Sequence, residues 1–535
     1  MGMSRAALPR DGVWTALLLA LFALYYITPG APLSLVLLAL CAVACYLRLP
    51  LAVSLVPLAM PFYMLPKHLG PHRDFSLGET AIVLCATVFA LVQGRALLTS
   101  RGARRRVLRR LTHPTPLDLA IGLFLVAATA TMLATHGELY HLALRQYRVA
   151  ILEPILYYVL AASTLRGARA ISRALWALAG AGLLVALLGL GQYVFRPGTL
   201  TGATWTGDTR HAARFVSAVY GSPDNLALLL DRAIPVAVVL GLLGLSARRA
   251  ARASLLSYLP WLAVAPMAVA LLLSNSRGGI IVAVAAAVAA LLLWRARTDG
   301  RAMSWSPRAR ALAAGGLAAV LAVAGLALLA IYHGHSGSRR LLVWKSALAM
   351  IHDHPLLGVG PDNFLYYYFD PRTGIDHTHP GARSCLPGSL SIVNALPKHY
   401  MDPQAWQEPC LSHPHNIVLD LWLSTGLLGL VAMLAVIFIA GRYAWRSWRA
   451  LQTSPATPAS MGAGQDTTPP QAVLIASVVV VGATVAHGLV DNSLFLPDLA
   501  VDFWLAIALI TNIRSVGVGV TDPSNQRDLR SAARG

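Results

Sequence analysis

Charge is scarce in this sequence. Of its 535 residues only 12% are charged, whereas 56% are hydrophobic, and the mean hydropathy is +0.61. A soluble domain carries about 25% charged residues, so the composition excludes an ordinary soluble protein. Apolar runs recur from Val13 to Ile513, and about 20 such residues suffice to cross a hydrocarbon core. The sequence therefore predicts an all-α polytopic membrane protein.

Acidic residues are scarcer still, with 23 Asp and Glu against 43 Lys and Arg. The resulting net charge of +20 would suit a nucleic-acid-binding protein if the basic residues covered one surface. They instead form short clusters between apolar runs, such as the seven arginines from Arg95 to Arg110, as the positive-inside rule predicts for cytoplasmic loops. We therefore expect cytoplasmic N- and C-termini and no nucleic-acid partner.

Several familiar motifs are also missing. The first apolar run, from Val13 to Thr28, lacks a small-residue cleavage site, so we expect no cleaved signal peptide. No P-loop or Rossmann glycine motif occurs, so the sequence predicts no nucleotide cofactor. Of only five cysteines, three lie in apolar runs. The other two, Cys385 and Cys410, lie in one polar segment, and we expect them to form a disulfide in an oxidising compartment; two free thiols too far apart are the alternative.

The apolar runs predict about 12–14 transmembrane helices. The expected spans are residues 13–29, 32–47, 50–66, 78–97, 115–135, 144–163, 174–195, 224–245, 255–273, 280–294, 311–332, 412–440, 472–490 and 500–514. Four parts follow: transmembrane helices with short loops over 1–332, one large outer loop over 333–411, C-terminal transmembrane helices over 412–514, and a disordered cytoplasmic tail over 515–535.

The long segment 333–411 carries much of the unusual polar chemistry. It is too rich in Pro, Gly and His to be a simple linker, and outer loops of this size are functional or disordered. Its many aromatic residues predict a folded cap on the membrane. The stretch from Arg340 to His352 has the apolar spacing of a helix.

Arginines recur at the outer ends of the expected spans. Arg277 lies in the short polar break Ser274–Gly279, where two glycines follow it and could expose backbone N–H groups to an anion. Arg210 and Arg214 share one face if their segment is helical. The alternative for Arg277 is an arginine that extends to the membrane interface without binding anything.

A second outer pair, Arg145 and Arg148, lies three residues apart. Glu153 follows in the same expected span, and a carboxylate within a membrane normally has a partner or a function. The two readings are an anion site and a buried structural ion pair.

Histidines gather near the same face. His413-Pro414-His415-Asn416 joins the large loop to the next span, and a neutral imidazole there could act as a general base. Three more His-x-His pairs occur at His333/His335, His352/His354 and His377/His379. A metal site is the alternative, but no cysteine or carboxylate set with zinc spacing accompanies them, so we expect no metal.

These features together predict chemistry on a phosphate-linked group outside the cytoplasm. Converging guanidinium groups suit a diphosphate, and a histidine suits activation of a hydroxyl group. Nucleotide donors are normally absent from that side of the membrane. A lipid-linked diphosphate donor would satisfy both constraints.

The motifs resemble those of the O-antigen ligase family, within the superfamily of O-antigen polymerases and bacterial O-oligosaccharyltransferases. The strongest likeness is His415-Asn416, nine residues, Gly426, two residues, Gly429. Further segments resemble the superfamily's conserved turns and periplasmic loop: Gly221–Ala227, Ser274–Gly278, Arg340–Trp344 and His354–Phe364. The likeness covers about 205–430, and its spacing with one late large loop favours ligase over polymerase.

The resemblance implies a membrane-embedded, GT-C-like, metal-independent inverting glycosyltransferase of the bacterial inner membrane. It would transfer polysaccharide from undecaprenyl diphosphate to a sugar hydroxyl of lipid A–core at the periplasmic face. The implied catalytic residues are His415 as general base and Arg277. Arg210, Arg214 and Arg340, and less directly Arg145 and Arg148, would bind the diphosphate, with His413 and Asn416 in support.

Three rivals remain open. An O-antigen polymerase would use the same donor with a lipid-linked glycan as acceptor. A polysaccharide flippase or transporter would carry charges near the bilayer midplane and internal repeats, and no clear inverted repeat is found. A rod-shape-type peptidoglycan glycosyltransferase would need a catalytic acidic loop that the sequence does not clearly match.

Overall fold

The computed structural model describes residues 11–68, 74–166, 168–195, 215–249, 258–298, 335–369, 396–402, 404, 411–453 and 469–518. Over these residues the chain is almost entirely helical. Its only strands there are β1 (Lys67–His68) and β2 (Asp74–Phe75), which pair antiparallel. The predicted all-α polytopic fold is confirmed.

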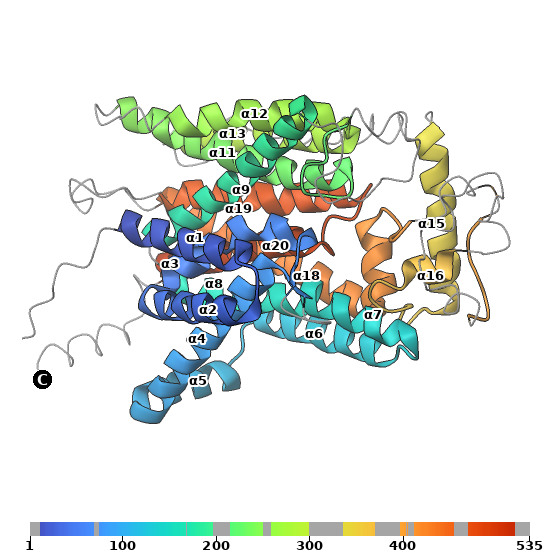
Figure 1. The fold of residues 1–535 in the computed structure, drawn as a ribbon, viewed down its shortest axis with the longest axis horizontal. Coiled ribbons are helices and arrows are strands. Elements are labelled where there is room, and N and C mark those ends of the chain that lie inside the picture. Colours follow the sequence, from blue (N-terminus) through green and yellow to red (C-terminus); the bar gives the residue numbers. More distant parts are fainter. Residues whose placement is uncertain are drawn as a thin grey trace, which may run out of the picture.

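The helices follow the apolar runs closely (Figure 1). The first group is α1 (Asp11–Ile27), α2 (Ala31–Leu47), α3 (Leu49–Ala59), η1 (Met60–Met64), α4 (Leu77–Thr99), α5 (Arg101–Thr112), α6 (Pro116–Leu133), α7 (Glu138–Gln146), η2 (Tyr147–Leu152), α8 (Glu153–Thr164) and α9 (Ala168–Phe195). The second is α11 (Pro223–Arg249), α12 (Leu259–Ser274), α13 (Arg277–Thr298), α15 (His335–Asp353), α16 (Phe364–Tyr368), α18 (Ile417–Thr453), α19 (Pro470–Gly488) and α20 (Pro497–Val518).

Seven of the helices within the described ranges are long and apolar enough to cross a membrane, and four shorter apolar helices of 10–17 residues accompany them. The expected span 311–332 lies outside the described residues. The expected span 144–163 is not one regular helix: α7 passes through the π-helical η2 into α8. Pro154, near the start of α8, has no N–H to donate, which removes one α-helical hydrogen bond at this junction.

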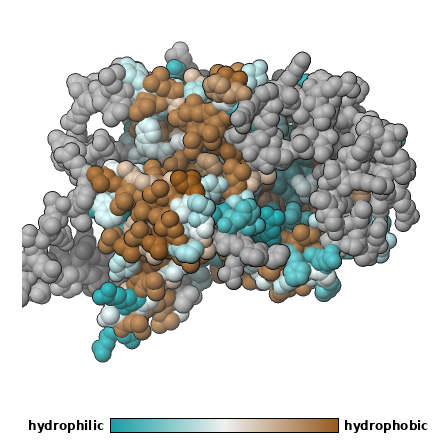
Figure 2. All heavy atoms as spheres, in the orientation of Figure 1, coloured by the Kyte–Doolittle hydropathy of each residue, from teal (hydrophilic) through white to brown (hydrophobic). Residues whose placement is uncertain are grey.

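The interior of the bundle is built around α11, α19 and α20. The apolar window of α11 is 89% buried, and α11 packs against α9, α12, α13 and α19. Outer helices keep large apolar side chains exposed, among them Val126 on α6 and Phe438 on α18. Figure 2 shows brown surface over the middle of the visible face. Such exposed apolar cover is what lipid contact requires.

At one end of the bundle, α15 and α16 form a small cap (Figure 1). They enclose a core of their own, which includes Val343, Met350 and Tyr368 and reaches Leu423 of α18. Asp353 at the end of α15 accepts a hydrogen bond from the Tyr400 hydroxyl at 2.8 Å. The described part of the expected outer loop is therefore folded, while its boundaries at 333 and 411 stay a prediction.

A break in α18 holds this cap in place. Gly426 has φ 72°, and an added Cβ there would lie 2.3 Å from the Leu356 carbonyl oxygen. Across the break, the Leu427 N–H donates to that oxygen at 3.0 Å, and the Val359 N–H donates to the Leu423 carbonyl at 2.8 Å. The loop after α15 therefore satisfies backbone groups that the interrupted helix leaves open.

Candidate functional site

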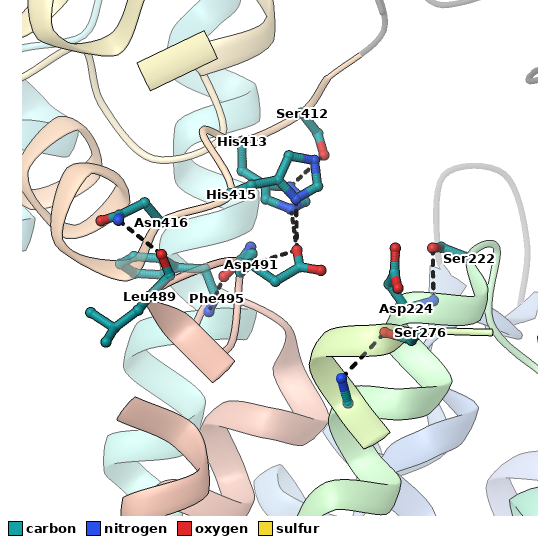
Figure 3. Close-up of polar contacts among 12 residues, drawn as sticks. Ser222, Asp224, Ser276, Ser412, His413, His415, Asn416, Leu489, Asp491 and Phe495 are labelled. Atoms are coloured by element: carbon teal, nitrogen blue, oxygen red, sulfur yellow. Dashed lines mark hydrogen bonds and ion pairs between the residues drawn. The ribbon is translucent and has the colours of Figure 1, made fainter. Parts of the chain in front are cut away.

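His415 lies at the entrance to α18, on the side of the bundle that carries the cap. Its backbone is left-handed, with φ 49°, a conformation that is uncommon for a residue other than glycine. Its Nδ1 lies 2.7 Å from an Asp491 carboxylate oxygen (Figure 3). That contact leaves Nε2 without a hydrogen-bond partner among the described residues, and the His415 side chain is 18% exposed.

Asn416, the residue after His415, connects two parts of the site. The Asn416 side-chain oxygen accepts hydrogen bonds from the N–H groups of Val418 (3.0 Å) and Leu419 (3.2 Å), and so caps α18. Its amide nitrogen donates to the Leu489 carbonyl at 3.1 Å. The same residue thus starts the helix and ties it to the loop between α19 and α20.

Asp491 lies in that loop, and its Oδ1 is within hydrogen-bond distance of both His413 and His415. The Asn492 N–H also donates to its Oδ1 at 2.8 Å, while its buried Oδ2 has no described partner. Burial alone would raise the pKa of Asp491, but the neighbouring His415 and His413 outweigh burial and hold that pKa well below its usual range. The carboxylate is therefore ionised at neutral pH and able to stabilise an imidazolium.

The two histidines differ in what they leave available. His413 points Nε2 toward Asp491 at 3.4 Å, and its Nδ1 lies 2.8 Å from the Ser412 hydroxyl. Both of its ring nitrogens therefore have partners, whereas only one of the two in His415 does. With Nδ1–H facing Asp491, the Nε2 lone pair of His415 is available to accept a proton.

His413, His415 and Asp491 could also hold a metal ion, because one ligand atom from each lies within 4.8 Å of the others. Two ligands that each bind one zinc ion tetrahedrally lie roughly 3.3 Å apart. The 2.7 Å between His415 Nδ1 and Asp491 Oδ1 is shorter and fits a direct hydrogen bond. The geometry therefore favours a hydrogen-bonded pair over a shared ion.

Arg277 begins α13, after a left-handed Asn275 at φ 58°. Its side chain is exposed and pairs with no described residue. The next residue, Gly278, packs closely against His487, because an added Cβ there would lie 2.9 Å from His487 Nε2. His487 is the next-to-last residue of α19. Its carbonyl accepts hydrogen bonds from the N–H groups of Val490 and Asp491, both at 3.0 Å. The Arg277 turn and the Asp491 loop therefore share His487 as a neighbour.

Arg145 lies in the last turn of α7. Burial raises the pKa of Asp362 to about 6, and the positive charges of Arg145 and His413 oppose that rise. Asp362 is itself left-handed, with φ 61°. Arg148 has another role, because it forms ion pairs with Glu79 and, at 3.7 Å, with Glu153. The structural ion pair expected as one reading of Arg148 is present.

Other residues selected from the sequence are not brought to this site by any contact. Arg340 is partly exposed on α15 and pairs with no described residue. Arg210, Arg214, Cys385 and Cys410 lie outside the described residues, so their diphosphate-binding and disulfide roles stay predictions.

Sequence reasoning missed several polar residues in the interior. His487 Nδ1 lies 2.6 Å from Asp231, and both side chains are almost fully buried. Arg232, wholly buried, donates to the Ser493 carbonyl at 2.6 Å and to Thr484 Oγ1 at 3.0 Å. Asp231 and Arg232 within an apolar run were the available signal, because charge inside a membrane span is costly. Asp491 gave no such signal.

The fold and the site together define a polytopic membrane protein with a histidine–aspartate pair at one end of its bundle. Residues 262–434 match the family model described as O-antigen ligase. This segment of the chain is therefore similar to the O-antigen ligase superfamily. A comparison with curated proteins found no match. The matched segment contains Arg277, Arg340 and His415 and ends before Asp491.

Proposed function

We propose that this protein is an O-antigen ligase of the bacterial inner membrane. It would transfer polysaccharide from undecaprenyl diphosphate to a sugar hydroxyl of lipid A–core, at the periplasmic face, with both chain termini in the cytoplasm. The observation that carries the proposal is the His415–Asp491 pair, in which one imidazole nitrogen faces an ionised carboxylate and the other has no described partner. That arrangement suits a general base for a hydroxyl group.

The reaction is a single displacement with inversion. The acceptor hydroxyl oxygen attacks the anomeric carbon as its proton passes to His415 Nε2. The bond between that carbon and the diphosphate oxygen breaks, and undecaprenyl diphosphate leaves with the electron pair. Asp491 stabilises the imidazolium that forms, as the carboxylate of a catalytic triad does.

Arg277 is proposed to bind the leaving diphosphate. Its exposed guanidinium stands at the start of α13, where the helix dipole also favours negative charge. The shared neighbour His487 keeps this turn beside the Asp491 loop. Arg145 is a further candidate, because its charge influences Asp362, as that of His413 does. Arg210, Arg214 and Arg340 are further candidates on sequence grounds, whereas the ion pairs of Arg148 favour a structural role.

Acceptor choice separates this proposal from its rivals. Purified protein is incubated with lipid-linked glycan alone and with lipid A–core added. Glycan on lipid A–core is the expected product; longer lipid-linked chains in both reactions would instead indicate a polymerase. No covalent product in either reaction contradicts the proposal and favours transport.

Two additions to that assay test the site. Strong chelation should leave the rate unchanged, because the proposed chemistry uses no metal. Arg277→Lys should lose most activity, since a lysine ammonium group cannot form the bidentate contact of a guanidinium. Arg442→Lys, at an exposed position on α18, is the matched control and should be fully active. Full activity of Arg277→Lys would remove Arg277 from the site.

A further inference from the structure

A short basic helix leaves the bundle where a membrane span ends. The span is α4, with 23 residues and a mean hydropathy of 2.0 over its apolar window. At 1.5 Å per residue it is about 34 Å long, slightly more than the hydrocarbon core of about 30 Å. The next helix, α5, begins at Arg101 after the single extended residue Ser100. The covalent chain therefore places α5 at a membrane surface.

The turn between the two helices is held by specific hydrogen bonds. Ser100 Oγ accepts from the Ala103 N–H at 3.3 Å, which caps α5. Arg104 reaches back and donates to the carbonyls of Leu97 at 2.7 Å and Leu98 at 3.1 Å. These carbonyls belong to the last turn of α4 and would otherwise lack partners. As a result α5 stands at a set angle to α4 and projects from the bundle (Figure 1).

The composition of α5 is one-sided. Its sequence RGARRRVLRRLT contains six arginines and no acidic residue. Apolar side chains beside them are nevertheless exposed: Leu108 by 62%, Val107 by 41%, and Leu98 at the turn by 81%. In Figure 2 the projecting part at lower left is correspondingly both teal and brown. A lipid–water boundary accommodates both kinds of side chain.

We propose that α5 is an interfacial anchor that binds the phosphate groups of anionic phospholipids. Arg105 and Arg109, four residues apart and both exposed, share one face of the helix and suit bidentate contact with phosphate. Val107 and Leu108 enter the boundary of the acyl chains. Charge complementarity names anionic lipid as the occupant, and the membrane-spanning α4 supplies the location. This anchor is independent of the transfer chemistry.

The test compares full-length protein in nanodiscs of phosphatidylcholine with protein in nanodiscs that also contain an equal amount of phosphatidylglycerol. Hydrogen exchange of the backbone amides of 101–112 is measured, with the amides of α4 as internal reference. Exchange in α5 should slow at least about fivefold in the anionic discs. The attraction of a single arginine to an anionic leaflet already shifts the binding equilibrium by about that factor. The α4 amides should not change.

A charge-matched pair of variants completes the experiment. Arg105→Gln with Arg109→Gln should remove most of the slowing, whereas Arg442→Gln with Arg446→Gln, which removes two exposed arginines from α18, should keep it. Equal exchange in the two kinds of disc overturns the proposal, as would occur if α5 bound a protein partner. So does a loss of slowing that is the same in both double variants, because it would report net charge alone.

Discussion

Two histidine–aspartate pairs of nearly identical geometry serve different regions of this protein. In the outer pair, His415 Nδ1 lies 2.7 Å from Asp491, and the histidine is 18% exposed. In the inner pair, His487 Nδ1 lies 2.6 Å from Asp231, and neither side chain is more than 2% exposed. The His–Asp hydrogen bonds are alike in length, but the outer pair is accessible and the inner pair is buried. Only the outer imidazole can meet a substrate, while the inner one can stabilise packing beneath the Arg277 turn.

The largest expected effect is on the outer pair. His415→Gln should lower kcat by about 10²–10⁴-fold, the usual contribution of a general base, with a smaller loss of thermal stability than in the inner pair because glutamine can still donate a hydrogen bond to Asp491. Transfer to lipid A–core in single-turnover assays measures it. His413→Ala is the matched control and should lose less than about tenfold, since both of its nitrogens already have partners. The reverse order of the two losses would reassign the base to His413.

The inner pair should respond in the opposite way. His487→Ala leaves Asp231 buried without its partner, and breaking a buried pair typically costs about 3–5 kcal/mol. Thermal unfolding in detergent should show the loss, and the activity per folded molecule should fall far less than in His415→Gln. If stability is unchanged while kcat collapses, the inner pair takes part in the chemistry and the distinction between the pairs fails.

Asp491→Asn sharpens the same contrast. Asparagine can keep a contact to His415 but cannot supply the negative charge that stabilises an imidazolium, so kcat should fall by about 10²-fold or more while KM changes little. The kcat and KM values of transfer separate these effects. A rise in KM with kcat unchanged would place Asp491 in acceptor binding instead.

The smallest expected effect concerns Asp362, whose pKa responds to the charge of His413. Its folded pKa of about 6 is above the unfolded value of about 3.9, so the folded state binds this proton more tightly. Stability should therefore fall as pH rises from about 4 to 6. Asp362→Asn should flatten that slope, raising Tm at pH 7 relative to wild type by about 1–2 °C. An unchanged slope would show that Asp362 is not the titrating group.

The positions of the helices were easier to predict than the side-chain contacts between them. The expected span 78–97 corresponds to α4 and the span 224–245 to α11 within a few residues, because an apolar run of sufficient length permits little besides a helix in a membrane. The run 144–163 is also helical, but hydropathy does not register the π-helical turn before Pro154.

The candidate site divides in the same way. His415 and Arg277 stood out because they follow local motifs, and the helix over Arg340–His352 was expected inside α15. Asp491 could not be expected to meet His415, because 76 positions separate them and only the packing of α18 against α19 brings them together. Pairings of this kind depend on tertiary structure and leave no periodic pattern in a single sequence.

The break at Gly426 gives the spacing of the histidine motif a mechanical meaning. Nine residues between Asn416 and Gly426 set how far around α18 the imidazole lies from the point where the cap is attached. One inserted residue would turn His415 by about 100° relative to the cap, although no side chain at the site would have been altered. The length of this interval therefore sets the orientation of His415 relative to the cap. A change in its length should abolish activity even though every residue of the motif is retained.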